Sequence, residues 1–397
     1  MKRVLLFFVA LLFYGCGSVD NNNADANTPS SVAYKSSWVK NVDIDGFTSS
    51  SVRDNEGNFY FASTDSKDFR ISKLDADANI IWSKKYETEL ENFGGIITID
   101  KDNNILLGGI QSSDFSNYDD YEVIAMKFSP DGELLWQSFN PTSKSDIVYD
   151  ITTDSQANIY IVGGLNAGTD DEAFVVKYSS AGRFEWIKSI NSNYFTNAHS
   201  VVVDEEDNIY ITGVTGRDIF FAKYLPDGTR SIYKEYKTTA DERSTHMCLG
   251  KDGYIYVGGY YILDDGEEPE LFVKKIDKFG DEIYFTVFDY IEGMEYIHAV
   301  NADENGNVFL YGEYYIATND ETKLFLTQVN SVGSITNKYL FDGNAYLGNL
   351  LTKTDLSLDK DNNIYISGPG FVKLTGDESN QGSYVLKLVP VDENQTL

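Results

Sequence analysis

Cysteine, histidine and proline are scarce in this chain, and so are basic residues. With only two cysteines, Cys16 and Cys248, disulfides cannot be what stabilises a domain of this size. Three histidines and no Gly-x-Ser-x-Gly motif give no support to a Ser-His-Asp hydrolase. Basic residues number 32 against 62 acidic ones, and the net charge of −30 excludes the basic footprint of a nucleic-acid-binding protein.

Long hydrophobic runs are also missing, and the only marked one lies at the N-terminus. Lys2 and Arg3 precede an apolar run at residues 4–13, which is shorter than the roughly 20 residues that a membrane-spanning helix needs. A basic start followed by a short apolar run is the pattern of a secretory signal peptide. The sequence therefore predicts export.

The end of this signal resembles a lipobox, the site at which a signal peptidase cuts before a lipidated cysteine. Gly15 precedes Cys16 as in the motif, whereas Phe13 stands where leucine is usual. We expect residues 1–15 to be the signal peptide and Cys16 to be lipidated, so that an acyl chain anchors the protein in a bilayer. An ordinary secretory signal with a coincidental cysteine is the alternative.

Residues 16–34 are mostly polar and small, a composition that cannot bury enough surface to order the backbone. We interpret them as a flexible tether between lipid and domain. Residue 17 is glycine and not aspartate, which under the enterobacterial retention rule favours the outer over the inner membrane. The expected location is the cell envelope, either periplasmic or surface-exposed.

One pattern recurs at a spacing of about fifty residues through the rest of the chain. An apolar strand is followed by Asp-x-x-(Gly/Asp/Ala)-Asn and then by an aromatic-rich strand ending in glycine. The copies are DNEGNFYFAS (54–63), DKDNNILLGG (100–109), DSQANIYIVG (154–163), DEEDNIYITG (204–213), DENGNVFLYG (303–312), DKDNNIYISG (359–368) and a degenerate GKDGYIYVGG (250–259). Asp and Asn favour tight turns, so each copy predicts a β-hairpin.

Each copy continues with two further strands. The third ends in lysine plus an apolar residue in six copies, and the fourth carries an aromatic that we expect to pack between neighbouring repeats. These aromatics are Trp82, Trp136, Trp186, Tyr233 and Tyr284. Seven units of four antiparallel strands predict an all-β fold, a seven-bladed β-propeller, over residues 35–391, followed by a short tail at 392–397.

The two ends of the domain give an independent indication of ring closure. The last copy stops after its third strand, near Val389, while residues 38–42 match the fourth strand at residues 186–190. We therefore expect the N-terminal strand to complete the C-terminal blade and close the ring.

The repeat resembles the seven-bladed β-propeller repeat family (SBBP). The unit Asp-x-x-Gly-Asn-x-Tyr-x-x-Gly is followed by the strand at 173–178, then by Gly182 and Trp186. The resemblance extends over residues 38–389, and it implies a propeller exported by a bacterium without implying a common activity. The Gly-His and Trp-Asp signature of WD40 blades is absent from the sequence.

The three histidines are the strongest candidates for a site. His199 and His298 each lie five residues before a turn aspartate, and His246 lies near the same place in the fifth copy, about one residue off. These positions start the innermost strands of three adjacent blades, so the imidazoles are candidate ligands for a transition metal. Ordinary variation is the alternative, because the other copies have Ser49, Gly95, Tyr149 and Thr354 there.

Acidic residues gather in the loops between second and third strands, which emerge on one face of a propeller. The candidate residues of this acidic loop face are Asp119, Asp120, Asp170, Asp171, Asp264, Asp265, Glu267 and Glu268. They favour either a calcium site or a solvated negative rim, and no loop has the ligand spacing of an EF-hand. Four tyrosines expected to be exposed lie nearby: Tyr260, Tyr261, Tyr314 and Tyr315.

These features favour a monomeric, non-enzymatic binding scaffold for a protein, peptide or glycan, with no catalytic residues and no required cofactor. The alternative is a metal- or calcium-dependent propeller enzyme, a lyase or hydrolase, that would use the histidines and the carboxylates of the same face. A third possibility is a purely structural envelope protein with no small ligand.

Overall fold

The computed structural model describes residues 34–65, 67–88, 90–113, 121–139, 145–166, 172–190, 194–263, 269–289, 294–316, 321–341, 344–346, 352–373 and 382–391. The first hairpin of each repeat forms as the sequence predicts. In blade three the Asp154 carboxylate accepts hydrogen bonds from the backbone N–H groups of Gln156 and Asn158 at 2.9 and 2.8 Å, while Ala157 adopts a left-handed φ of 58°. The repeated Asp and Asn therefore stabilise turns.

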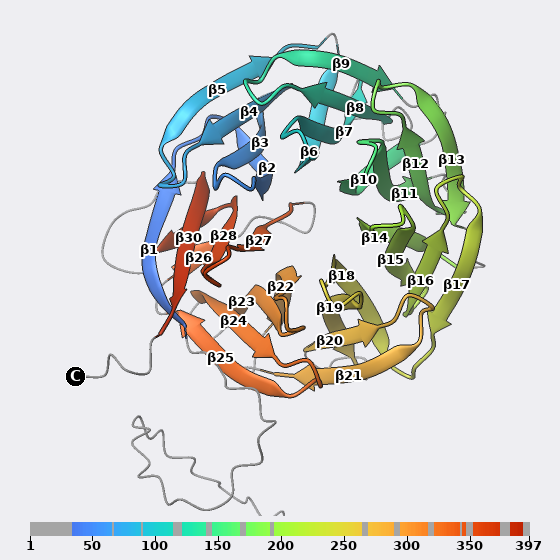
Figure 1. Ribbon diagram of the computed structural model, residues 1–397, viewed down its shortest axis with the longest axis vertical. Coiled ribbons are helices and arrows are strands. Elements are labelled where there is room, and N and C mark those ends of the chain that lie inside the picture. The colour runs from blue at the N-terminus through green and yellow to red at the C-terminus, as the bar shows by residue number, and fades with distance from the viewer. Residues whose placement is uncertain are drawn as a thin grey trace, which may run out of the picture. The chain divides into compact units, whose positions relative to one another are not determined.

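Seven four-stranded antiparallel sheets stand around a common axis within the described residues (Figure 1). Blades one to three contain β2 (Phe47–Arg53), β3 (Phe59–Asp65), β4 (Asp68–Leu74), β5 (Ile80–Tyr86), β6 (Glu91–Ile99), β7 (Ile105–Ser112), β8 (Glu122–Phe128), β9 (Leu134–Phe139), β10 (Ser145–Thr153), β11 (Ile159–Asn166), β12 (Glu172–Tyr178) and β13 (Phe184–Ile190).

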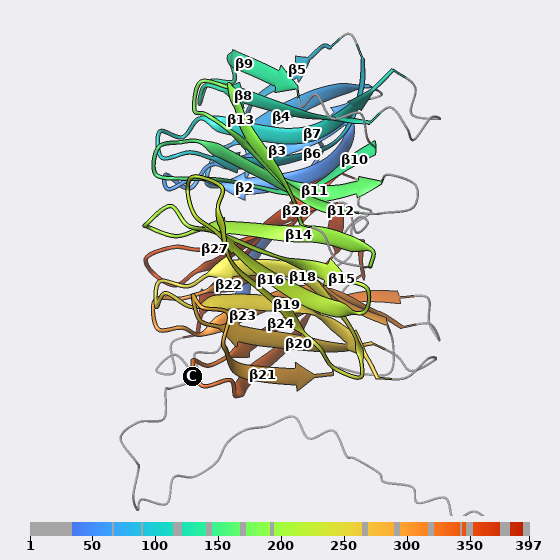
Figure 2. The same cartoon turned by 90° about the vertical axis from the view of Figure 1, so that its right-hand side faces the viewer.

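Blades four to six repeat the same order from the axis outward. They contain β14 (Thr196–Val203), β15 (Ile209–Thr215), β16 (Asp218–Tyr224), β17 (Arg230–Tyr236), β18 (Asp241–Leu249), β19 (Ile255–Ile262), β20 (Glu270–Ile276), β21 (Glu282–Phe288), β22 (Met294–Ala302), β23 (Val308–Ile316), β24 (Glu321–Val329) and β25 (Ile335–Phe341). The side view in Figure 2 shows these sheets following one another around the ring.

Blade seven joins the two ends of the domain and confirms the predicted closure. Its strand order is β27 (Asp355–Leu358), β28 (Ile364–Pro369), β30 (Ser383–Pro390) and β1 (Tyr34–Val42). β1 pairs antiparallel with β30, with Trp38 opposite Lys387 and Val42 opposite Ser383, and the blue and red strands lie side by side in Figure 1. The sequence did not predict one small addition, a sheet of β26 (Asn344–Tyr346) and β29 (Phe371–Lys373).

The core lies between blades, because each sheet can bury its faces only against its neighbours. Tyr160 and Val162 of blade three, for example, share one buried cluster with Ile209 and Phe220 of blade four. Cys248 is a free thiol. Among the described residues no helix is long and apolar enough to cross a membrane.

The fourth-strand aromatics also join neighbouring blades, which confirms the predicted packing. Trp136 of blade two donates from Nε1 to the Ser180 carbonyl of blade three at 3.1 Å. A Cβ atom at Gly182, which has a φ of +78°, would lie 2.5 Å from the same indole ring. The glycine of the last hairpin therefore permits both the turn and the close approach of the tryptophan.

Candidate functional site

A bulge in the innermost strand of most blades directs one side chain away from the regular pleat. The register skips one residue in β2, β10, β14, β18 and β22, and a wider irregularity occurs in β6. The skipped residues are Ser49, Tyr149, His199, Thr245 and His298. Because a bulge reorients its side chain, these positions do not follow the alternation of an ordinary strand.

The bulges explain the positions of the three histidines. His199 and His298 are themselves the skipped residues of β14 and β22, whereas in β18 the skipped residue is Thr245 and His246 follows it. The offset seen in the sequence is therefore real. All three side chains line one cavity of about 390 Å³, here called the channel cavity.

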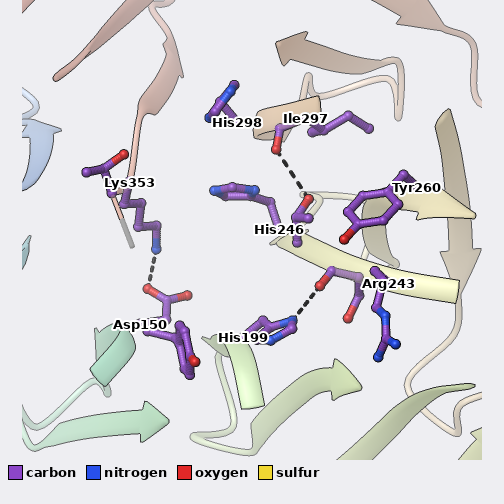
Figure 3. Close-up of a pocket in the computed structure, with 12 residues that line it drawn as sticks. Asp150, His199, Arg243, His246, Tyr260, Ile297, His298 and Lys353 are labelled. Carbon is purple, nitrogen blue, oxygen red and sulfur yellow. Dashed lines mark hydrogen bonds and ion pairs between the residues drawn. The ribbon is translucent and has the colours of Figure 1, made fainter. Parts of the chain in front are cut away.

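The channel cavity is formed by five blades. Its lining comprises Tyr149, Asp150, His199, Arg243, Ser244, Thr245, His246, Tyr260, Ile297, His298, Thr352 and Lys353. Figure 3 shows the imidazole of His246 between His298 on one side and Asp150 and His199 on the other. The structure thus brings the sequence-predicted histidines into one cavity.

His199 ties two blades together. Its Nδ1 lies 2.6 Å from the backbone oxygen of Ser244 in the next blade, so this nitrogen carries the proton and donates. Ser49 makes the equivalent bond from Oγ to the Gly95 carbonyl at 2.6 Å, and Thr245 reaches the Ile297 carbonyl at 3.3 Å. Burial lowers the pKa of His199, so its imidazole is neutral at pH 7.

His298 is held by a carboxylate of its own blade. Only 6% of the residue is exposed, and its Nε2 lies 3.3 Å from Oε1 of Glu313. Nε2 has no hydrogen bond of good geometry within the described residues. His298 is therefore positioned less tightly than His199.

His246 lies beside the backbone of the next blade. Its Nδ1 is buried and has no hydrogen bond of good geometry in the part of the chain that the structure describes, although the Ile297 backbone is close enough to oppose the lowering of its pKa. Burial, followed by the nearby charge of Lys353, lowers the pKa of His246 well below its usual value. A neutral imidazole consequently lines the cavity.

Opposite the histidines, an ion pair links blades seven and three. The Lys353 ammonium group contacts Oδ1 of Asp150 (Figure 3). The other carboxylate oxygen accepts from Ser200 Oγ at 2.9 Å and from the Val201 N–H at 3.0 Å. The backbone of Lys353 is fixed in turn, since its N–H donates to the Ser49 carbonyl at 2.8 Å.

Sequence reasoning missed Asp150, Arg243 and Lys353, which contribute the charges of the cavity. Lys353 precedes the short strand β27 in a part of the chain where the repeat pattern fades, so its place near the axis has no repeat signal. Asp150 could have been found, because it follows Tyr149, the position equivalent to His199 in an earlier copy.

The remaining predicted residues have separate outcomes. Cys16 and the acidic loop face residues lie outside the described residues, and among the described residues no three His, Cys, Asp or Glu side chains are grouped to hold a metal ion. The prediction that four tyrosines are exposed is wrong. Tyr314 is 4% exposed because it packs into the cluster between blades five and six, and Tyr260, Tyr261 and Tyr315 are half-buried.

Comparisons with known proteins support the propeller fold. No protein-family model matches the chain. An uncharacterized WD repeat-containing protein of Acanthamoeba polyphaga mimivirus is 25% identical over 284 residues, which is 71% of this chain but only 17% of the viral protein.

Solved structures match over most of the chain. They include the Dos1 propeller (TM-score 0.55, 9% identity, 89% of this chain and 94% of that one) and the polysaccharide lyase Uly1 (0.50, 9%, 88% and 90%). The GH74 xyloglucanase of Xanthomonas campestris (0.50, 12%, 85% of this chain) is matched over 53% of its length. At these identities the likeness concerns the fold alone.

Proposed function

We propose that this chain is an exported, lipid-anchored binding protein of the cell envelope, in which the propeller is a non-enzymatic scaffold and the channel cavity is the ligand site. The observation that carries the proposal is the cavity itself. Its volume is within the range of small-ligand sites, and it gathers charged, polar and aromatic side chains from five blades.

The envelope location rests on the sequence. A signal-like N-terminus precedes Cys16, and the polar residues after it fit a tether. The repeats fit a divergent member of the SBBP family, whose propellers are largely exported. The partner is a protein, peptide or glycan presented in the envelope, and the outer membrane is favoured over the inner.

Site-specific photo-crosslinking in the native envelope tests the binding role. A photoreactive phenylalanine analogue replaces Tyr149, which lines the cavity, and in a control strain it replaces Ile283, which is exposed on the outer strand β21. We expect an adduct from position 149 and none from position 283. Equal labelling from both positions, or none from position 149, would contradict a ligand site in the channel.

The second candidate, a metal-dependent lyase or hydrolase, rests on the shared lining position of the histidines, although among the described residues they are not grouped to hold a metal ion. Three imidazoles from adjacent blades line one cavity, and imidazole is a good transition-metal ligand. Elemental analysis of the protein purified without chelators separates the candidates. Bound zinc, copper, nickel or iron at one equivalent would favour the enzyme. The metal-dependent enzyme would be eliminated if the protein is metal-free and added metal does not change its melting temperature.

A further inference from the structure

The channel cavity differs in charge from the molecule around it. The chain as a whole has a net charge of −30, yet the cavity lining contains two permanent cations, Arg243 and Lys353, and one carboxylate, Asp150. That carboxylate is nearly fully engaged, because it accepts from Ile151 N, Ser200 Oγ, Val201 N and the Lys353 ammonium group.

We propose that the channel cavity binds an organic carboxylate, which is received by the ammonium group of Lys353 and the imidazole of His246. The proposal rests on the proposed binding function and names the chemistry of its ligand. Two classes of ligand share this chemistry, acidic sugars and acidic amino-acid derivatives, because both carry a carboxylate on a small polar molecule.

The ammonium group of Lys353 has N–H donors that are not used within the described residues. An ammonium group carries three N–H donors, and within the described residues its hydrogen-bond partner is Asp150 alone. The side chain is 30% exposed, so the remaining donors open toward the cavity. Asp150 holds the ammonium in place, and a ligand carboxylate would add a second, charge-assisted partner.

His246 offers the ligand a neutral imidazole. Its ring lines the cavity and lies between His298 and the Lys353–Asp150 pair (Figure 3). Nδ1 is itself buried, near the Ile297 backbone, so the ligand would meet the rest of the ring. A neutral imidazole donates one N–H, and a ligand carboxylate would accept it from Nε2.

Arg243 adds to the preference for an anion without having to touch it. Its guanidinium group is held by Asp241, with Nε 2.9 Å from Oδ1, and by the Gly216 carbonyl, 2.9 Å from Nη1. Because Asp241 offsets much of the Arg243 charge, the guanidinium group adds only a secondary attraction for an anion beside that of Lys353. Tyr149 and Tyr260 complete the lining with surfaces against which an aliphatic or sugar skeleton can pack.

Calorimetric titration of the mature, full-length lipoprotein in detergent tests the proposal. The probes are D-glucuronate, N-acetylglutamate and neutral glucose at matched ionic strength. We expect binding of at least one of the two acids, and the acid that binds identifies the source of the carboxylate. Glucose should bind at least about tenfold more weakly, because it cannot use the charge-assisted contacts.

Matched variants connect the binding to the named donors. Lys353→Met alone would strand the buried Asp150, so the test variant combines Lys353→Met with Asp150→Asn. Lys234→Met, which removes a lysine from an ion pair on the outer strand β17, is the control. We expect the double variant to lose at least about tenfold in affinity, His246→Leu to weaken binding as well, and the control to bind like the wild type.

Two outcomes would overturn the proposal: binding of neither acid, or undiminished binding of the acid by the double variant. These outcomes are distinguishable from failure of the proposed function. A crosslinked partner at position 149 without acid binding would leave the binding scaffold standing and would remove only the carboxylate assignment.

Discussion

The ammonium group of Lys127 lies 2.9 Å from the carboxylate of Asp100, and both side chains are almost completely buried. The pair joins the third strand of blade two to its first hairpin turn. In blade three the equivalent lysine, Lys177, lies 5.3 Å from the centre of the Tyr160 ring, and the Tyr160 hydroxyl donates to the turn carboxylate of Asp154 at 2.9 Å. The repeated lysine is therefore structural. It also reaches the turn aspartate in blade five, where Lys275 lies 3.0 Å from Asp252 and the Tyr256 hydroxyl donates to the same carboxylate.

Lys127→Met is expected to destabilise the protein by about 3 kcal/mol, because it leaves a buried carboxylate without its cation. Equilibrium denaturation in urea measures the change. Lys84→Met serves as the control, since Lys84 pairs with the exposed Glu133 and such surface pairs contribute about 1 kcal/mol or less. Equal losses in the two variants would show that the buried pair has no special role.

Gly182→Ala is expected to cost about 3 kcal/mol, which combines the strain of a left-handed alanine with a clash against the Trp136 ring. Gly253 has the same φ of +78°, but a Cβ there would meet nothing within 4 Å. Gly253→Ala should therefore cost only about 1 kcal/mol. If both variants melt at the same temperature, packing of the tryptophan against the next blade does not contribute to stability.

The Asp355 carboxyl gives a pH dependence of known sign. Burial raises its pKa to about 6 against the opposing influence of Ser357, Lys353 and Arg53. Between about pH 4, near the value of an unfolded chain, and pH 6 the native state binds more protons than the unfolded state. The free energy of unfolding therefore falls as pH rises through this window and is not affected further above it.

Asp355→Asn removes this dependence. Between pH 4 and pH 8 the wild type should lose about 2 kcal/mol of its free energy of unfolding through this carboxyl, and the variant should not. Denaturation curves at the two pH values measure the difference. A wild-type-minus-variant difference that stays constant with pH would contradict a raised pKa.

Lipidation of Cys16 is tested by metabolic labelling with an alkynyl fatty acid. We expect the wild type and Cys248→Ser to incorporate label and to sediment with membranes, whereas Cys16→Ser should do neither. Cys248→Ser is the matched control, because it removes the other cysteine of the chain. Label retained in Cys16→Ser would contradict the lipoprotein assignment.

The sequence predicted the ring because its signals are local and repeated. Turn aspartates such as Asp154 bond to their own hairpins, and the unmatched strand at the N-terminus pairs with β30. The cavity was only partly predictable, because bulges break the alternation on which strand patterns depend. In β18 the bulge residue is Thr245, so His246 lies one position beyond the place that the repeat predicts. Lys353 reaches the cavity from a segment that does not follow the repeat pattern.

The central claim is that a ligand binds in the channel cavity, and the histidines provide a direct measurement of it. The chain contains three histidines, and all three line this cavity. In ¹H–¹³C spectra of histidine-labelled protein, a carboxylate that binds there should shift all three imidazole signals. The signal of His246, which is assigned from its loss in His246→Leu, should shift the most. Saturating ligand that leaves the three signals unmoved would contradict the account.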